Sequence, residues 1–400
     1  MSHLAANRNH VWSDIVLIIL FLAGIYLPIG DNLLRLDHTQ PPVEKRTLAP
    51  LPKTKLGLET LADLREEWEA YYNDHFGFRN RLIRLHNYVK TQWLHTSPSS
   101  KVVLGKDGFL FYTGDDAIEY YRSVRPFTLR DLAHCQLVLE ERQDWLMARG
   151  AHFLVVIAPS KETIYPEYMP ARMNRVRSES RLDQLLAHLA AHSDIAILDL
   201  RRPLLNAKTQ IRVYDRTDTH WNGYGAYVAY QEIMSRVARW LPQAQPVPLS
   251  AFQLRSSLGP PGDLAELLGM EHVLTEEHIS LLPLSPRAAI RVDPGELLRL
   301  PFAQITQPIV RERPGPHLPR AVVLRDSFAI RLIPLLSEHF SRVVYLWEYR
   351  FDLPVIEHEQ PDVVILEIAE RSLMLPATFP TNDPPVRKPP TSRQGIGLPW

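Results

Sequence analysis

The chain has 400 residues, enough for two or three domains, or for one large domain with extensions. Its 45 Lys and Arg residues equal its 45 Asp and Glu residues, so it has no basic excess of the kind that nucleic-acid binding requires. The single cysteine, Cys135, excludes an intrachain disulfide and a Cys-based zinc or redox site. The 34 prolines gather in linkers and in the tail, which indicates folded blocks joined by stiff segments.

The first 37 residues predict a short N-terminal tip followed by a transmembrane anchor. Ile15 to Ile29 is an uninterrupted, mostly apolar stretch, and adding residues 11–14 brings it into the range of roughly 17–25 residues that a spanning helix needs. A cleaved signal peptide and a buried core helix are the alternatives. No Ala-x-Ala-like cleavage site follows Tyr26, which favours the uncleaved anchor. Basic residues lie on both sides of the stretch, so charge does not set its orientation.

A Pro-rich linker at 38–57 precedes a predicted globular domain at 58–375. Apolar residues at helical spacing predict two helices with a turn between them over 58–95. Lys-Asp-Gly between two strand-like runs predicts a hairpin at 102–112. The Pro-rich tail at 376–400 is expected to be disordered.

Beyond the hairpin, helices alternate with continuous Val, Ile and Leu runs. Helices are expected at 128–149, at 180–191 and from about Ser327. The strand-like runs are 152–159, 195–200, 321–325, 343–347 and 362–368. Such runs are typical of a parallel sheet covered on both faces, so the sequence predicts a doubly wound α/β domain. Residues 243–319 read as an insertion with small strands, one of them near Ile290.

Ligands of open parallel sheets gather outside the carboxyl ends of the strands, so polar residues that follow strands are the candidates for a site. Asp218 and His220 are two residues apart and project to the same side of an extended stretch. Ser327 ends a predicted strand and opens a predicted helix. A serine hydroxyl becomes a nucleophile when a base takes its proton, and a carboxylate orients that base. The three residues can fill these roles, with the Ser327 backbone N–H as one oxyanion donor.

Each piece also has a structural interpretation. Asp218 can be a turn former, and Asp326 and Ser327 can simply cap a helix. Asp218 and His220 can also be metal ligands, but no further cluster of clear spacing accompanies them, so neither a metal nor a cofactor is predicted. Cys135 is expected in the core.

An ordered set of motifs resembles the alginate O-acetyltransferase AlgJ/AlgX family of SGNH-hydrolase-like proteins, of the DHHW type. The motifs follow the N-terminal export segment and extend to Arg371. They are DHFGFR (74–79), GKDGFLFY (105–112), APSKETIYPEYMP (158–170), TDTHWN (217–222), GDLAELLG (262–269), RDSF (325–328) and EIAER (367–371).

The resemblance implies an SGNH-hydrolase-like fold with Asp218, His220 and Ser327 as catalytic triad. It implies acetyl transfer through Ser327 to hydroxyls of an exported polysaccharide, alginate-like or another exopolysaccharide. It also implies a single-pass inner-membrane protein with its N-terminal tip in the cytoplasm and its catalytic domain in the periplasm. The implied partners are a membrane-bound O-acyltransferase that relays the acetyl group and other secretion components.

One position departs from the family pattern, since Arg325 stands where a glycine would complete Gly-Asp-Ser. No Gly-x-Asn-Asp block supplies the usual second oxyanion donor either. The predicted substrate or oxyanion contacts are Lys161, Tyr165, Trp221 and Arg371. A structural salt bridge or hydrogen bond is the alternative for residues 161, 165 and 371.

Three other functions stay open. A periplasmic carbohydrate acetyl esterase would use the same triad with water as the acceptor. A non-catalytic scaffold of an exopolysaccharide secretion complex would only bind glycan. A metal-dependent hydrolase would use the same Asp and His residues.

Overall fold

The computed structural model describes residues 2–34, 47–52, 61–300, 308–315 and 317–379. The chain divides into two compact units. The anchor unit comprises Met1–Ser99 and Glu266–Val273, and the globular unit comprises Ser100–Ala265 and Leu274–Trp400. The globular unit therefore begins at Ser100, whereas the sequence predicts a domain start near residue 58. The predicted linker at 38–57 lies mostly outside the described residues.

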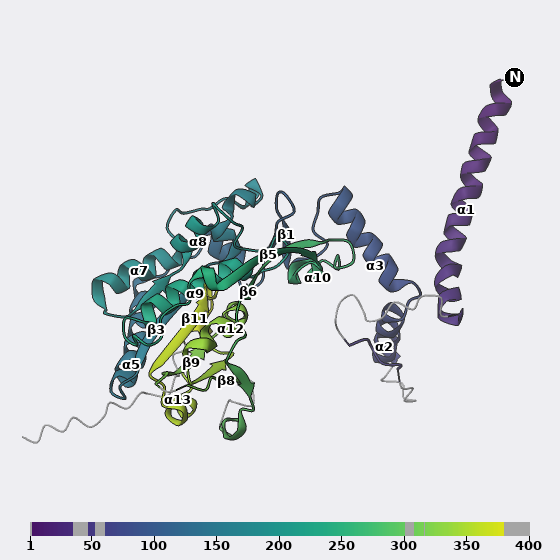
Figure 1. The fold of residues 1–400 in the computed structure, drawn as a ribbon. Helices are drawn as coiled ribbons and strands as arrows, with labels where there is room; N and C mark the ends of the chain where they lie inside the picture. The colour runs from purple at the N-terminus through teal and green to yellow at the C-terminus, as the bar shows by residue number, and fades with distance from the viewer. Residues whose placement is uncertain (1, 35–46, 53–60, 301–307, 316, 380–400) are drawn as a thin grey trace, which may run out of the picture. The chain divides into compact units, whose positions relative to one another are not determined.

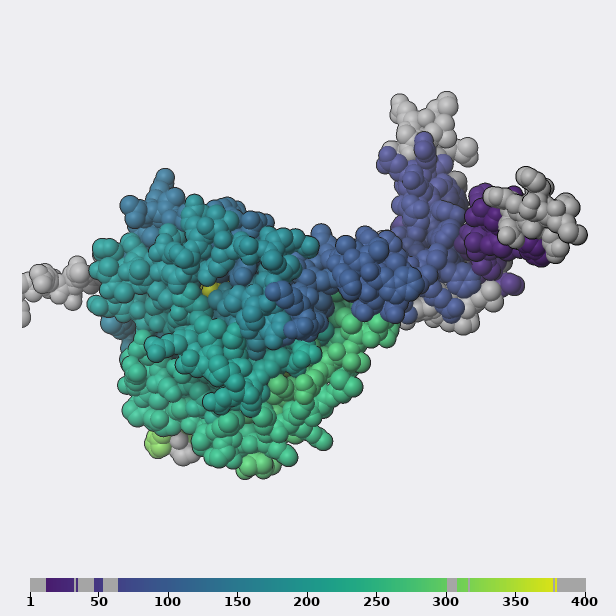
Figure 2. Space-filling model, turned by 90° about the horizontal axis from the view of Figure 1, so that it is seen from above, coloured from purple at the N-terminus to yellow at the C-terminus, as the bar shows by residue number. Residues whose placement is uncertain are grey.

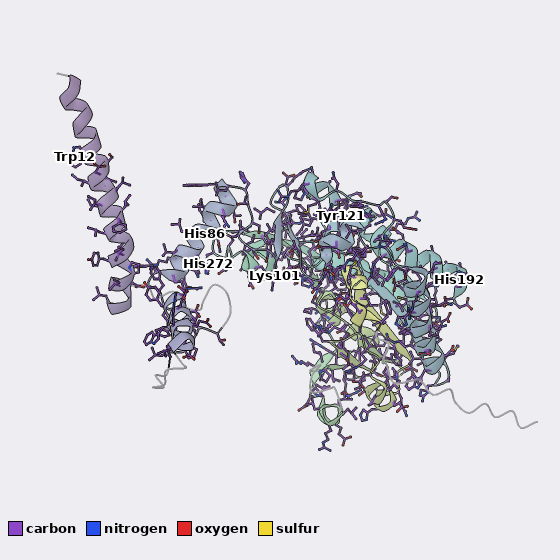
Figure 3. All side chains as sticks on the ribbon, turned by 180° about the vertical axis from the view of Figure 1, so that it is seen from behind. Trp12, His86, Lys101, Tyr121, His192 and His272 are labelled. Carbon is purple, nitrogen blue, oxygen red and sulfur yellow. The ribbon has the colours of Figure 1, made fainter. Side chains whose placement is uncertain are left out.

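The anchor unit is helical. It consists of α1 (Ser2–Leu34), α2 (Leu61–Asp74), α3 (Arg79–Tyr88) and a π-helical turn at Val89–Trp93, so the two helices predicted over 58–95 are present. Trp12–Asp31 of α1 is long and apolar enough to cross a membrane, and its side chains, such as that of Trp12, are largely exposed (Figure 3). This agrees with a single-pass anchor.

A seven-stranded sheet forms the centre of the globular unit (Figure 1). Its strands, in spatial order, are β4 (Ile197–Asp199), β3 (His152–Ala158), β11 (Val363–Ala369), β9 (Arg320–Leu324), β10 (Arg342–Leu346), β8 (Ile309–Glu312) and β7 (Ile290–Val292). The first five run parallel, but β8 and β7 are antiparallel to their neighbours. The sheet is therefore mixed, and the expectation of a wholly parallel sheet was wrong at this edge.

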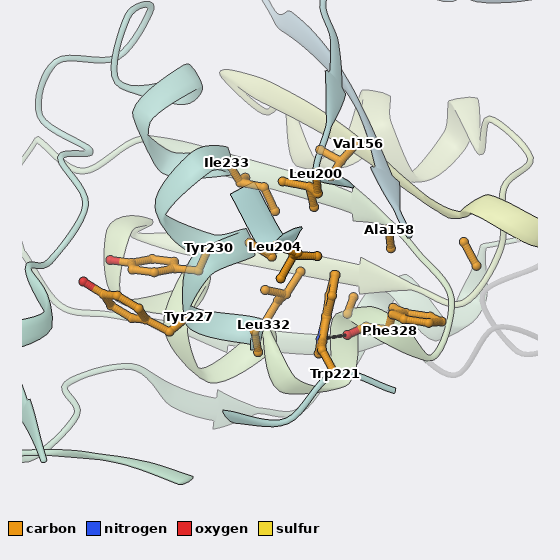
Figure 4. Packing of buried hydrophobic residues seen from close by; sticks show 14 of the residues in the cluster. Val156, Ala158, Leu200, Leu204, Trp221, Tyr227, Tyr230, Ile233, Phe328 and Leu332 are labelled. Carbon is orange, nitrogen blue, oxygen red and sulfur yellow. Dashed lines mark hydrogen bonds between the residues drawn. The ribbon is translucent and has the colours of Figure 1, made fainter. Parts of the chain in front are cut away.

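Both faces of the sheet are covered, as the continuous apolar strands predict. Along β3, Leu154 and Val156 belong to one core cluster and Phe153 and Val155 to the other. One face packs against α5 (Leu129–Met147), α7 (Arg181–His192) and α13 (Leu353–Glu359). The other face packs against α6 (Lys161–Ile164), α8 (Arg201–Ala207), α9 (Gly223–Val237) and α12 (Ile333–Leu336) (Figure 4).

Local sequence signals explain where the main helices begin. Thr128 and Asp131 form a capping box at the start of α5, and Ser180 and Asp183 form another at the start of α7. The side chain of Asn222 accepts hydrogen bonds from two N–H groups in the first turn of α9. This cap fixes the point where the loop before α9 ends.

Short strands complete the unit. The predicted hairpin is present as β1 (Val102–Leu104) and β2 (Leu110–Tyr112), while β5 (Phe252–Gly259) and β6 (Glu276–Pro283) pair antiparallel. Two strands of the predicted insertion at 243–319 thus pair with each other, and two join the main sheet as β7 and β8.

The C-terminal tail begins later than predicted. A 3₁₀ turn, Pro376–Thr378, is followed by Phe379, which is buried in a core cluster. The expected disorder is therefore wrong for residues 376–379, and the rest of the predicted tail lies outside the described residues. Just before it, Glu370 and Arg371 follow β11 and are buried. On the face drawn in Figure 2 the yellow C-terminal residues show as a small spot among teal ones.

Candidate functional site

Asp218, His220 and Ser327 form one hydrogen-bonded chain, although 107 residues separate the last two. His220 Nδ1 lies 2.8 Å from Asp218 Oδ1, and His220 Nε2 lies 2.8 Å from Ser327 Oγ. With the Nδ1 proton donated to the carboxylate, which is the assignment the network favours, Nε2 accepts the hydroxyl proton of Ser327. This is the arrangement in which an imidazole can deprotonate a serine.

The two halves of this chain come from neighbouring parts of the fold. Asp218 and His220 lie on a loop closed by a bridge between Tyr214 and Trp221, immediately before α9. Ser327 follows the carboxyl end of β9, the fourth of the five parallel strands from the β4 edge. The structure thus brings together the residues that the rule for strand ends singled out.

The charge of Asp218 is held in place by its partner. Burial opposes ionisation, but the hydrogen bonds and the charge of His220 outweigh it and lower the pKa of Asp218 to about 2. The carboxylate also accepts a hydrogen bond from the His220 backbone N–H at 2.8 Å. Asp218 is consequently a permanent negative charge beside the imidazole, as stabilisation of an imidazolium requires.

Lys161 holds the loop that carries Asp218 and His220. Its ammonium donates to the carbonyl oxygens of Asp215, Arg216 and Asp218, at 3.3, 3.0 and 2.5 Å. An ammonium has three protons, so these contacts use all of them. The side chain is only 2% exposed, and burial lowers its pKa to about 8. Lys161 thus holds the loop by hydrogen bonds, which is the structural alternative to the predicted substrate or oxyanion contact.

A buried carboxylate of β6 holds the same loop from another side. Glu276 accepts from the backbone N–H of Thr217 at 2.7 Å and from its hydroxyl at 2.8 Å, and it pairs with Arg212 at 3.1 Å. The Thr217 hydroxyl oxygen in turn accepts from the N–H of Gly262 at 2.8 Å. A β-carbon at Gly262 would lie 2.4 Å from Cβ of Asp218, so the close approach requires glycine.

Asp263 is a residue of the site that the sequence analysis missed. Its Oδ1 accepts from the backbone N–H of Thr219 at 2.7 Å, and its Oδ2 lies 3.9 Å from His220 Nδ1. With Asp218 and His220 it makes a group whose ligand atoms all lie within 4.8 Å of one another, close enough to hold a metal ion. The only signal was its place in the GDLAELLG motif, where it follows the glycine that contacts Asp218.

The turn that carries Ser327 is fixed by Asp326. One carboxylate oxygen accepts from the N–H of Phe328 at 2.8 Å, and the other accepts from the N–H of Ala369 at 2.7 Å and from the Tyr349 hydroxyl. The N–H of Asp326 donates to Glu367 at 3.1 Å. Burial, followed by the charge of Asp326, raises the pKa of Glu367 well above its usual range.

Ser327 precedes a 3₁₀ helix, which is wound more tightly than the α-helix that the sequence predicts. The residues after it form a 3₁₀ helix, Phe328–Arg331, followed by the single turn of α12. A helix this short has little macrodipole, so a helix dipole adds little at the serine. Among the described residues, the backbone N–H of Ser327 has no hydrogen-bond partner. It is a free donor beside the serine oxygen.

Two further predicted contacts lie inside the unit. The Tyr165 hydroxyl accepts from the N–H of Val213 at 2.9 Å, and burial raises its pKa to about 12. Trp221 is fully buried, and its Nε1 donates to the carbonyl of Phe328 at 3.1 Å (Figure 4). Both therefore connect the two halves of the site to the core rather than facing a substrate. For Tyr165 this is the structural alternative, and for Trp221 it corrects the expectation.

Arg371 lies close to the serine turn. Its guanidinium carbon is 5.5 Å from the Phe328 ring centre and 5.4 Å from that of Tyr112, and its Nε is 3.5 Å from Asp115. The residue is 9% exposed. Like Trp221, it lies against Phe328, the residue following Ser327, but it brings a charged group there.

Comparison with known proteins identifies the fold class of the globular unit. Residues 102–284 match the family model described as "SGNH hydrolase-like domain, acetyltransferase AlgX". In fold, the chain is similar to Bacillus cereus PatB1 with a sulfonyl adduct, at 15% identity and a TM-score of 0.50, over 68% of this chain and 97% of that one. The globular unit is therefore an SGNH-hydrolase-like α/β domain with a mixed sheet.

The curated relatives narrow the resemblance to AlgJ. The chain is 32% identical over 178 residues to the probable alginate O-acetylase AlgJ of Pseudomonas syringae pv. tomato, which is 44% of this chain and 42% of that protein. It is 27% identical over 223 residues to that of Pseudomonas aeruginosa, 56% of this chain and 51% of that protein. The matches thus span about half or less of these relatives, and they confirm the resemblance to the AlgJ/AlgX family.

Proposed function

We propose that this protein is a serine O-acetyltransferase that acetylates hydroxyl groups of an exported polysaccharide. The observation that carries the proposal is the hydrogen-bonded chain from Asp218 through His220 to Ser327, with 2.8 Å at both links. The relatives named as alginate O-acetylases support the reaction class. An alginate-like exopolysaccharide is the acceptor that these names favour.

In the first half of the reaction, Ser327 Oγ attacks the carbonyl carbon of an acetyl ester. His220 Nε2 takes the hydroxyl proton as the new C–O bond forms, and the negative charge of Asp218 stabilises the imidazolium. The oxygen of the tetrahedral intermediate accepts a hydrogen bond from the free N–H of Ser327. The intermediate then expels the donor's alkoxide, which takes the proton from His220 and leaves acetyl-Ser327.

In the second half, a sugar hydroxyl replaces the departed donor. His220 Nε2 removes its proton, the sugar oxygen attacks the acetyl carbon, and the serine oxygen leaves with the proton held by His220. The products are an O-acetyl sugar and the free serine. With water in place of the sugar, the same steps release acetate, which is the esterase alternative.

The second oxyanion donor is proposed to be the guanidinium of Arg371. Support comes from its place against the Phe328 ring and from its fixed positive charge near the serine turn. The buried Lys161 is proposed to act as a positioning residue through the loop carbonyls, and Asp263 through the Thr219 N–H.

Location and partners follow from the same proposal. The apolar helix α1 is proposed to anchor the chain in the inner membrane, with the globular unit in the periplasm. Acetyl thioesters of the cytoplasm do not reach that side, so a membrane-bound O-acyltransferase is the proposed acetyl relay. Other components of exopolysaccharide secretion are the proposed neighbours.

The test compares Ser327→Ala with Ser257→Ala, which changes an exposed serine of β5. Each purified chain receives 4-nitrophenyl acetate and mannuronate oligosaccharides, and acetylated sugar and free acetate are measured separately. The proposal predicts acetylated sugar from the parent and from Ser257→Ala, and none above background from Ser327→Ala. Release of acetate without acetylated sugar would favour the esterase. Equal transfer to sugar by Ser327→Ala and by the parent would exclude the serine mechanism. Loss of activity with a chelator would favour a metal centre at Asp218, His220 and Asp263.

A further inference from the structure

Trp347 is unusual among the aromatic side chains of the globular unit. It follows the carboxyl end of β10 and is 51% exposed. All other described Phe, Tyr and Trp side chains of this unit are buried or partly buried. Single exposed apolar side chains are common on protein surfaces, so the position of this ring decides whether it can bind a ligand.

The strand register places this ring beside the serine turn. Leu346 of β10 pairs with Leu324 of β9, so Trp347 lies next to Arg325, two residues before Ser327. The hydroxyl of Tyr349 bonds to the Asp326 carboxylate, which ties the segment after β10 to the turn that carries the serine. Trp347 therefore belongs to the same edge as the hydrogen-bonded chain described above.

Arg325 lies with its guanidinium against the ring of Trp347. Its guanidinium carbon lies 4.5 Å from the ring centre of Trp347, while the residue itself is only 4% exposed. The guanidinium also donates to the carbonyl of Asp326 at 3.0 Å. One face of the ring is therefore covered by the guanidinium, while half of the residue stays exposed to solvent. The arginine that replaces the family's glycine thus serves as a backing for this ring.

We propose that Trp347, backed by Arg325, is the stacking platform for a pyranose ring of the acceptor polysaccharide. One face of a pyranose carries C–H bonds with partial positive charge, and such a face packs well on the electron-rich face of an indole. A sugar held there, beside Ser327, can present a hydroxyl to the acetyl group. The inference rests on the proposed function and adds the acceptor site to it.

A polysaccharide fits this feature better than a protein partner does. A protein interface requires a contiguous apolar and aromatic patch of several hundred Å². Here the one exposed aromatic ring has a charged guanidinium behind it, and the only other exposed large apolar side chain on the serine turn is Ile330. A single ring is enough for a sugar.

The experiment measures acetyl transfer from 4-nitrophenyl acetate to a mannuronate hexasaccharide and, separately, to cellohexaose, using the full chain in detergent. For the better acceptor, Trp347→Ala is expected to raise KM about tenfold or more, with kcat changed less than about threefold. Trp347→Phe, which keeps a ring, should recover most of the affinity. Leu137→Ala is the matched control, since Leu137 is equally exposed but lies on α5. Thermal unfolding confirms that each variant is folded.

An unchanged KM in Trp347→Ala, or a Phe variant as defective as the Ala variant, would overturn the platform. Slower acetylation of Ser327 in Trp347→Ala, with the KM for the acceptor unchanged, would also overturn it, because the ring would then bind the acetyl donor. If the parent releases acetate in a Ser327-dependent way but acetylates neither sugar, water is the acceptor and the platform is wrong. If Ser327→Ala still acetylates sugar, the proposed function fails instead.

Discussion

The two halves of the site are held by opposite chemistry. The loop with Asp218 and His220 is held by a buried cation, Lys161, which donates to three carbonyl oxygens. The turn with Ser327 is held by carboxyl groups, since Asp326 accepts from three donors and its own N–H donates to Glu367. One half needs a buried ammonium that stays charged, and the other contains a buried carboxyl group whose pKa is raised. The two halves should therefore respond differently to substitution and to pH.

The largest effect on kcat is expected for Asp218, the carboxylate of the loop half that stabilises the imidazolium. Asp218→Asn removes the charge that stabilises the imidazolium and favours the wrong tautomer, so kcat for acetyl transfer should fall about 10³- to 10⁴-fold. Asp263→Asn is the matched change, because Asp263 lies farther from the same imidazole nitrogen. It should cost about tenfold or less. Equal losses would mean that the two carboxylates share the role.

The next effect is expected at Lys161. Lys161→Met keeps the length of the side chain but leaves three carbonyl oxygens without their donor, so the free energy of unfolding should fall by about 2–3 kcal/mol. Because the loop then loses its support, kcat should fall as well, by about tenfold or more. Urea titration and steady-state kinetics measure the two losses. Lys106→Met, an exposed lysine that contacts one carbonyl, should change neither by more than a fraction of these amounts.

The pH dependence of kcat should show the ionisation of Lys161. Burial lowers the pKa of Lys161 to about 8, while the charges of Glu162, Asp218 and Asp263 oppose that shift. Below that pH the ammonium donates three hydrogen bonds, and above it the neutral amine can donate only two. Transfer should therefore decline on the alkaline side, with an apparent pKa of about 8. Asp263→Asn removes one opposing charge and should move this limb to lower pH, and a limb that stays in place would count against the assignment.

The smallest effect is expected in the serine half. Burial and the charge of Asp326 raise the pKa of Glu367 well above its usual range, so the folded chain holds a proton at this carboxyl more tightly than the unfolded chain does. A raised carboxyl pKa means that stability falls as pH rises through the interval above the unfolded value. Glu367→Gln, which mimics the protonated form, should leave the free energy of unfolding at pH 7 within about 1 kcal/mol of the parent or raise it, and should flatten its pH dependence. A loss of several kcal/mol would show that Glu367 is ionised.

The sequence predicted the parts that depend on pattern and position. Continuous apolar runs gave the five parallel strands, and the rule for strand ends pointed to Asp218, His220 and Ser327. Sequence position does not show the direction in which a side chain points after a strand. Lys161 and Trp221 were therefore predicted as substrate or oxyanion contacts, but both face the interior. Asp263 and the antiparallel strands at the sheet edge lie in a Pro-rich stretch of weak periodicity, where only tertiary contacts define the structure. Trp347 gave no signal, because exposure is not visible in a pattern.

The most direct test of the account is to look for acetyl-Ser327 itself. The chain is mixed with 4-nitrophenyl acetate without acceptor, quenched in acid within the first turnover, digested, and analysed by mass spectrometry. The account predicts one added acetyl group on the peptide that contains Ser327, which disappears when acceptor oligosaccharide is added before the quench and never forms in His220→Ala. An acetyl group on another residue, or transfer to sugar with no acetylated serine at any time, would contradict it.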